Sequence, residues 1–269
     1  MPELGDTRDG SGGTNASGQP LPQIRTRVAV VLGGEAVAQA VPPGPFDFVI
    51  AADSGLDLAD HLGWSTDLIV GDLDSVSSGA LERARAAEIR IVEYPAGKDE
   101  TDFELAMSHA VELTADPVIT VVGGAGGRLD HLLANLAVIA SPRWAALEIT
   151  AWIGRSWIAV VRGHRHIAAS PGAVISLLAW HGDAAGVTTS GLEWELEDAT
   201  LAAGSALGTS NRSIGDHVDI SVMEGALTAT IADITVVDPE LRILQSSTRE
   251  SSALESSSVE CNNPEATAS

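Results

Sequence analysis

Cysteine and long apolar runs are almost missing from this sequence, and each absence excludes a class of protein. Cys261 is the one cysteine among 269 residues, so neither a disulfide nor a cysteine-based metal site can form within the chain. This favours a reducing, cytoplasmic location. No run of about 18 apolar residues is free of charges, glycine and proline, so we expect no membrane span. The first residues also lack the apolar core of a signal peptide.

Basic residues are scarce as well. Fifteen Lys and Arg face 37 Asp and Glu, which gives a formal net charge of -22. Binders of nucleic acid and of anionic lipid surfaces need a basic footprint, so neither partner is expected. Strong acidity suits cations, or anions that are bound through metal ions, although solubility alone also explains much of it. Hydrophobic residues make up 45%, which indicates a globular protein.

Residues 26–153 alternate between short apolar runs and helical patterns. The runs are rich in β-branched residues and nearly continuous, as expected of strands that are buried on both faces. The alternation predicts an α/β fold with a doubly wound, mostly parallel sheet. The predicted strands are 27–34, 48–53, 68–75, 89–95, 118–124 and 147–153, and the predicted helices are 56–62, 79–88, 101–113 and 129–140.

The second half has a different character. Residues 154–239 contain strand-like pieces separated by Gly, Asp and Asn, without a convincing helix, which predicts a smaller all-β sandwich domain. Among these pieces are 155–163, 164–170 and 187–196. Residues 1–25 are expected to be a flexible leader, and residues 240–269, rich in Ser, Glu and Asn, a disordered tail.

Two aspartates, Asp72 and Asp74, follow the apolar run 68–70 directly. In an extended chain, residues two apart point to the same face, so the two carboxylates would repel each other unless a cation lies between them. Carboxylates are hard oxygen ligands that suit Mg²⁺. Alternatively, one aspartate caps the next helix and the other is solvated.

A second segment, Lys98–Val111, places another carboxylate near a strand end. Thr101 and Glu104 form the pattern of a capping box, so Asp102 takes the first helical position, with Lys98 just before it. Together they would suit a metal-bound polyphosphate. An acid there could equally well do no more than complement the helix dipole.

The third segment is a glycine-rich loop that follows the predicted strand 118–124. Its glycines, Gly126 and Gly127 among them, allow backbone N–H groups to approach a phosphate, and Arg128 adds a planar fork for phosphate oxygens. Asp130 could be the helix N-cap. Leu132, Leu133, Leu136 and Ile139 form the expected buried stripe of the helix. No P-loop pattern occurs anywhere in the sequence.

In the predicted β domain, Leu192, Trp194 and Leu196 are expected on one face of a strand. An exposed Trp194 could stack on a flat heteroaromatic ring, and a Trp in the core of a sandwich is the alternative. Ser210 and Asn211 lie in a polar turn.

Taken in order, these segments resemble the thiamine pyrophosphokinase (thiamine diphosphokinase) family, in its bacterial form. The matching motifs are AADSGL, LIVGDLDS, KDETDFELAM, GGAGGRLDH, VTTSGLEWEL and GTSN, from about Val28 to Ile234. The resemblance implies that ATP donates a pyrophosphoryl group to the hydroxyethyl oxygen of thiamine, with Mg²⁺ as cofactor and AMP as the second product. It also implies a homodimer that binds thiamine between the α/β domain of one chain and the β domain of the other.

The resemblance further implies roles for single residues. Metal ligands would be Asp72, Asp74 and Asp102, which together with Arg128 form the expected catalytic set. The expected ATP and thiamine contacts are Asp53, Lys98, Gly126, Gly127, Arg128, Asp130, Trp194, Ser210 and Asn211. Lys98 is a point of variation, since animal members of the family carry Gln there.

Two other functions fit parts of the pattern. A haloacid-dehalogenase-type phosphatase also places Asp-x-Asp at a strand end, but there the pair follows the first strand, and here it follows the third without a Gly-Thr behind it. A non-catalytic sensor of thiamine or nucleotide would keep the fold without needing the full set of acids.

Overall fold

The computed structural model of the chain describes residues 25–34, 42, 44–126 and 128–232. Of the predicted leader only Arg25 falls in this part, and the predicted tail, 240–269, lies outside it. The predicted ligand Gly127 lies outside it too. No helix in the described part is long and apolar enough to cross a membrane.

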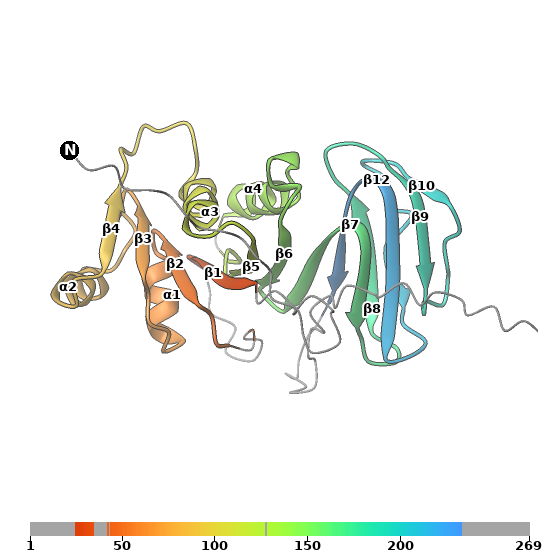
Figure 1. Cartoon of the computed structure of the whole chain (residues 1–269), viewed down its shortest axis with the longest axis horizontal. Helices are drawn as coiled ribbons and strands as arrows, with labels where there is room; N and C mark the ends of the chain where they lie inside the picture. The colour runs from red at the N-terminus through yellow and green to blue at the C-terminus, as the bar shows by residue number, and fades with distance from the viewer. Residues whose placement is uncertain (1–24, 35–41, 43, 127, 233–269) are drawn as a thin grey trace, which may run out of the picture.

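The first half of the chain is a six-stranded parallel sheet with helices on both faces (Figure 1). Its strand order is β6-β5-β1-β2-β3-β4. The strands are β1 (Thr26–Leu32), β2 (Phe48–Ala52), β3 (Leu68–Gly71), β4 (Arg90–Glu93), β5 (Pro117–Val122) and β6 (Glu148–Ile153). The helices are α1 (Gly55–His61), α2 (Ser78–Ala86), α3 (Asp102–Leu113) and α4 (Leu129–Ile139), with a short 3-10 helix, η1 (Pro142–Trp144). The predicted fold class is confirmed.

Both faces of the parallel sheet are buried. Val28, Val30 and Leu32 of β1 pack in the core shared with α3 and α4, whereas Ala29 and Val31 pack against α1. Figure 1 shows α3 and α4 on one side of the sheet and α1 and α2 on the other. Because successive side chains of a strand point to opposite faces, a continuous apolar run supplies both cores.

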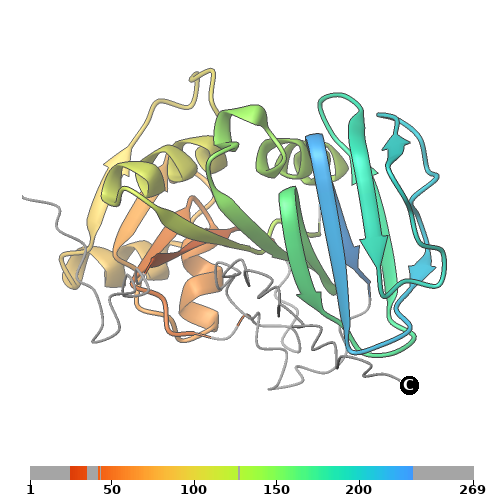
Figure 2. The same ribbon diagram turned by 45° about the vertical axis from the view of Figure 1, so that its right-hand side comes forward.

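Residues 156–232, the described part of the second half, contain strands and no helix (Figure 2). The long strand β12 pairs with β7 along most of its length, with β9 through residues 219–224 and with β8 through residues 227–231. A register shift between Val222 and Leu227 lets β12 join both groups, and its inward side chains build a separate core. The strands are β7 (Ser156–Ala168), β8 (Val174–Ala179), β9 (Ala184–Ser190), β10 (Ala199–Leu201), β11 (Asn211–Arg212) and β12 (His217–Ile231).

Two details of the predicted β half are wrong. Residues 155–163 and 164–170 were expected as two pieces separated at Gly163, but they form the single strand β7, and Gly163 takes φ +76° opposite the register shift of β12. Glycine adopts such a conformation without interrupting the pairing.

The second error concerns the strand expected at 187–196. Strand β9 ends at Ser190, because Gly191 turns the chain at φ +82° against the backbone of His217. Leu192 makes only an isolated bridge to Ser213, so Leu192, Trp194 and Leu196 do not share a strand face.

The two halves are joined through one sheet. β6 pairs with β5 in parallel and with β7 in antiparallel orientation, and the tight β6–β7 hairpin lies at residues 153–156. The proposed domain border at 153/154 therefore falls within a continuous ladder of strands. The division into separate domains stays a prediction.

Candidate active site

A cavity of about 760 Å³ lies at the carboxyl ends of β1, β2, β3 and β5. In open parallel sheets, ligands bind in this region because the loops after neighbouring strands meet there. Its volume is typical of a small-molecule site. It brings together eight of the predicted site residues: Asp53, Asp72, Asp74, Lys98, Asp102, Gly126, Arg128 and Asp130.

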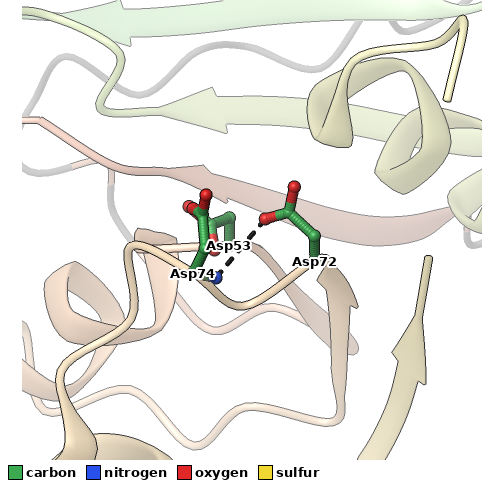
Figure 3. A group of neighbouring side chains, drawn as sticks. All are labelled: Asp53, Asp72 and Asp74. Carbon is green, nitrogen blue, oxygen red and sulfur yellow. Dashed lines mark hydrogen bonds between the residues drawn. The ribbon is translucent and has the colours of Figure 1, made fainter. Parts of the chain in front are cut away.

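Three carboxylates converge at one edge of the cavity (Figure 3). Oxygens of Asp53, Asp72 and Asp74 all lie within 4.8 Å of one another. Oδ1 of Asp53 is buried and has no hydrogen-bond partner. Burial raises the pKa of Asp53, and the negative charges of Asp102, Asp72 and Asp74 raise it further. Crowded, partly desolvated carboxylate oxygens are hard donors that fit a Mg²⁺ ion.

The backbone is turned to make these carboxylates meet. Strand β3 ends at Gly71, and Leu73 adopts φ +64°, so Asp72 and Asp74 converge through a turn and not through the extended chain that the sequence suggested. The N–H of Asp74 donates to Oδ1 of Asp72 at 3.4 Å. Asp53 also has a positive φ, +48°. Such a conformation costs a bulky residue about 1 kcal/mol or more, a strain that is concentrated at functional sites.

Helix α3 places Asp102 beside this cluster. The predicted capping box is present: Thr101 accepts from the N–H of Glu104, and Glu104 accepts from the N–H of Thr101 at 3.0 Å. Asp102 is therefore the first helical residue, as predicted. Its Oδ1 lies 2.9 Å from Nζ of Lys98, which is also 3.5 Å from Oδ2 of Asp72.

Asp102, predicted as the third metal ligand, contacts Lys98. Asp53, predicted as an ATP or thiamine contact, joins Asp72 and Asp74 in a group of carboxylates that could hold an ion. The role of Asp102 as a metal ligand stays a prediction. Partial burial opposes the charge of Lys98, but its contacts with Asp102 and Asp72 outweigh this and raise its pKa.

Glycines allow the loops after β1 and β5 to approach each other closely at the cavity. The N–H of Gly124 donates to the carbonyl of Gly33 at 2.8 Å. A Cβ on Gly34 would lie 2.3 Å from the carbonyl oxygen of Ala125, and one on Gly123 would lie 2.2 Å from that of Leu32. Only glycine permits this approach between the loops after β1 and β5. Gly33 and Gly34 were not predicted as site residues, although the LGG that ends a predicted strand was a signal.

Helix α4 begins at the rim of the cavity. Its N-cap is Arg128 and not Asp130, which lies in the first turn. The guanidinium of Arg128 donates to both carboxylate oxygens of Asp130, at 3.1 and 2.5 Å, and this contact lowers the pKa of Asp130. Asn135 also lines the cavity, and sequence reasoning missed it. It lies one turn after His131, so the two share a helix face.

The predicted stripe of α4 is partly wrong. Ile139 is buried and Leu132 and Leu136 are partly buried, but Leu133 is 54% exposed. Leu129, one turn earlier, is 67% exposed. An apolar edge of α4 therefore faces away from the protein core.

Trp194, Ser210 and Asn211 lie in the β half and do not line the cavity. They do lie close to one another. The buried side chain of Asn211 donates to the carbonyl of Trp194 at 2.6 Å and accepts from its N–H at 3.1 Å. Ser210, at φ +61°, donates its N–H to Oγ of Ser176. The Trp194 side chain is 59% exposed, so it is not a core residue. We call the segment around Trp194, which the Asn211 side chain holds through these two hydrogen bonds, the braced loop.

Two family models match the chain: the catalytic domain of thiamin pyrophosphokinase over residues 45–151, and its vitamin B1 binding domain over residues 164–227. The chain belongs to the thiamine pyrophosphokinase family. The family resemblance seen in the sequence is therefore confirmed, and with it the prediction that the chain is an enzyme, a thiamine diphosphokinase.

Curated relatives and solved structures carry the same family name. A thiamine pyrophosphokinase of Bacillus subtilis is 28% identical over 168 residues, 58% of this chain and 74% of the relative. Thiamine pyrophosphokinase 3 of rice is 29% identical over 160 residues, 55% of this chain and 58% of the relative. The crystal structure of the Geobacillus thermodenitrificans protein superposes with a TM-score of 0.64 at 26% identity, covering 77% of this chain and 97% of that one. The Bacillus subtilis structure gives 0.65 at 24% identity, covering 77% and 99%.

Proposed function

We propose that this enzyme transfers a pyrophosphoryl group from ATP to the hydroxyethyl oxygen of thiamine, giving thiamine diphosphate and AMP. Family membership supports the pyrophosphorylation of thiamine. The observation that carries the finer proposal is the group formed by Asp53, Asp72 and Asp74 at the cavity edge, with a buried oxygen of Asp53 that lacks a partner. Such a group suits a divalent cation, and a polyphosphate donor brings one.

The proposed reaction forms a bond between the hydroxyl oxygen of thiamine and the β-phosphorus of ATP. The bond between the β-phosphorus and the oxygen bridging to the α-phosphate breaks, and its electron pair leaves with AMP. The hydroxyl proton passes to a base, for which we propose one of the cavity aspartates. Catalysis of such transfers rests mainly on positioning and on electrostatic stabilisation.

Different residues of the chain would bind the metal ion and the phosphates. Asp53, Asp72 and Asp74 would hold Mg²⁺, which when bound neutralises charge on the phosphate oxygens. Lys98 and Arg128 would contact the phosphates, and the glycine loops bring backbone N–H groups to the same space.

The thiamine site is proposed to lie between two copies of the chain. Trp194 is exposed and braced by Asn211, yet it does not line the cavity that holds the aspartates. A second copy that places its β half over this cavity would bring the indole to the reacting end. The exposed Leu129 and Leu133 at the rim suit such a contact. We expect this homodimer to work in the cytoplasm.

One assay tests the reaction. The enzyme is incubated with ATP, Mg²⁺ and thiamine, and the products are separated. Equimolar thiamine diphosphate and AMP are expected. Phosphate release that does not depend on thiamine would instead indicate a phosphatase, and thiamine binding without turnover would indicate a sensor.

Mixing two variants tests the shared site. Asp72→Asn and Trp194→Ala are each assayed alone at limiting thiamine and then together after subunit exchange. If each site uses Asp72 of one chain and Trp194 of the other, the mixture recovers about a quarter of wild-type sites, because half of the dimers are hybrids with one intact site. Dimers that exchange subunits and recover nothing would place the thiamine site within one chain.

A further inference from the structure

Lys98 is the single lysine in a sequence of 269 residues. The other 14 basic residues are arginines, including those whose ion pairs fix the fold, such as Arg25 with Asp116 and Arg165 with Glu148. The one ammonium group of the described side chains therefore lies in the cavity, against the carboxylates. A sequence that uses arginine everywhere else has lysine at this one position.

The contacts of Lys98 show what the ammonium does there. Its Nζ lies 2.9 Å from Asp102 and 3.5 Å from Asp72, and the exposed fractions of the three side chains are 13%, 26% and 17%. Asp72 is shared, because it also belongs to the group with Asp53 and Asp74. The ammonium thus neutralises one side of a cluster whose other side has room for an ion.

The loop that carries Lys98 is fixed without this side chain. The N–H of Tyr94 donates to the carbonyl of Gly71 at 2.9 Å, and the guanidinium of Arg143 pairs with Glu100 at 2.6 Å. The capping box at Thr101 fixes the end of the loop. The Lys98 side chain can therefore change partners while its backbone stays in place.

The chemistry of the two basic side chains explains the choice. An arginine between two carboxylates forms planar, bidentate contacts that hold it in one geometry. An ammonium is a point charge on a flexible four-carbon stem, so it can leave one set of oxygens for another. A phosphate chain that enters the cavity offers such oxygens.

We propose that Lys98 is an exchangeable counter-ion that couples metal binding to nucleotide binding. Without nucleotide it occupies Asp72 and Asp102 and opposes the entry of a divalent ion. When the polyphosphate of ATP enters, Lys98 moves to the phosphate oxygens and frees Asp72 for the ion. Metal and nucleotide then raise each other's affinity by the same factor. This inference rests on the proposed function, since it requires a polyphosphate ligand.

Mn²⁺ binding to the whole chain, measured from free Mn²⁺ by electron paramagnetic resonance, tests the coupling. Wild type should bind Mn²⁺ weakly alone and more tightly with α,β-methylene-ATP. Lys98→Met should bind Mn²⁺ alone at least about tenfold more tightly than wild type, because a unit charge within 4 Å of a ligand has been removed. Lys98→Arg is the matched control: it keeps the charge, so Mn²⁺ binding without nucleotide should stay as weak as in wild type.

The single lysine also permits a direct observation. Protein labelled with ¹³C at the lysine ε-carbon gives one resonance. This resonance should shift when α,β-methylene-ATP is added, and it should shift less with diamagnetic Mg²⁺ alone, since the ion does not displace the ammonium by itself. A purely structural Lys98 would give the same resonance in all three states.

Two outcomes overturn the inference: unchanged Mn²⁺ affinity in Lys98→Met, or a resonance that does not respond to the nucleotide. Thiamine diphosphate formation by wild type is measured in parallel. If wild type forms product while either of these outcomes occurs, the counter-ion role fails and the proposed function stands. If wild type binds the nucleotide analogue with the expected coupling but forms no product, the proposed function fails instead.

Discussion

Asp53 in the α/β half and Asp219 in the β half are partly buried carboxylates with opposite surroundings. In the α/β half, the pKa of Asp53 is raised by burial and by neighbouring carboxylates. In the β half, burial also opposes the charge of Asp219, but His166 and His164 lie 3.0 and 3.1 Å from its Oδ1 and lower its pKa. The cluster around Asp53 retains an excess of negative charge beside a cavity, whereas Asp219 has two histidines against its carboxylate.

This difference separates two tasks. The α/β half has the electrostatics of a site for a cation and a polyphosphate, but its cavity is lined largely by glycines and acids, and among the described residues its aromatic rings are those of Phe103 and His131. The β half presents the exposed Trp194 on a braced loop and takes no part in the cavity. Each half therefore suits one of the two proposed substrates.

The largest expected effect is on the cation-binding half. Asp72→Asn or Asp74→Asn should lower turnover at least about 100-fold, the usual loss when one group that stabilises the transition state is removed. Thiamine binding, measured by quenching of Trp fluorescence, should change little. Near-normal turnover in either variant would remove the metal-binding role of that residue.

The next effect concerns the contact between the halves. Arg162 of β7 donates through Nη2 to the carbonyls of Ala140 and Ser141, at 2.6 and 2.9 Å, at the end of α4. Arg162→Met leaves these carbonyls without their donor, so it should lower the free energy of unfolding by about 1.5–3 kcal/mol, measured by urea denaturation.

Arg162→Lys serves as its control, since it keeps one charged donor and should recover part of the loss. ATP binding should weaken together with stability in Arg162→Met, because the other end of α4 lines the cavity. Unchanged stability would mean that α4 is held by its apolar contacts alone.

A smaller effect is expected in the aromatic half. Trp194→Ala should weaken thiamine binding about tenfold, the size of a cation–π contact with a cationic ring, and leave the affinity for ATP unchanged. Met223→Ala, at a side chain that is 81% exposed on the same half, is the control and should leave both affinities unchanged. Equal loss of ATP and thiamine binding in Trp194→Ala would contradict the division of tasks.

The smallest effects test the contrast in charge directly. At neutral pH, Asp53→Asn should raise the free energy of unfolding, because the charged form of a group with a raised pKa costs stability until the pH falls through that pKa. Asp219→Asn should lower it, because a group with a lowered pKa contributes stability that is lost only as the pH falls through the folded value.

Each change should be below about 1 kcal/mol, since both residues are only partly buried and solvent screens part of their charge. Urea denaturation at pH 7 gives the two signs, and the Asp219→Asn difference should shrink below about pH 4, near the ordinary value of 3.8. Two changes of the same sign would show that the charges of Asp53 and Asp219 do not have opposite effects on the free energy of unfolding.

Local patterns were sufficient to predict much of this molecule. The β-branched runs predicted all six parallel strands, and the Thr101–Glu104 pair predicted the start of α3 and the position of Asp102. These features depend on residues that are close in sequence: side-chain periodicity and hydrogen bonds within one turn. The sequence placed Asp72 and Asp102 near strand ends, and parallel strands end at one edge of a sheet, which brings the two residues together.

Other features could not be predicted from local patterns. Leu133 has the spacing of a buried residue, but its exposure depends on how α4 lies against the sheet. Trp194 follows a strand pattern, yet Gly191 ends the strand where it meets His217, a residue far along the chain.

What the sequence by itself determined is the set of elements in the α/β half, the order of the chemical groups along them and the family, because periodicity, caps and motifs are local properties. Only the tertiary structure decided which carboxylates lie close to one another. In the folded chain, oxygens of Asp53 lie close to those of Asp72 and Asp74, whereas Asp102 forms an ion pair with Lys98. These partnerships depend on distances of a few ångströms between loops that are distant in sequence, fixed by the positive φ angles of Asp53 and Leu73 and by the packing of α3 on the sheet.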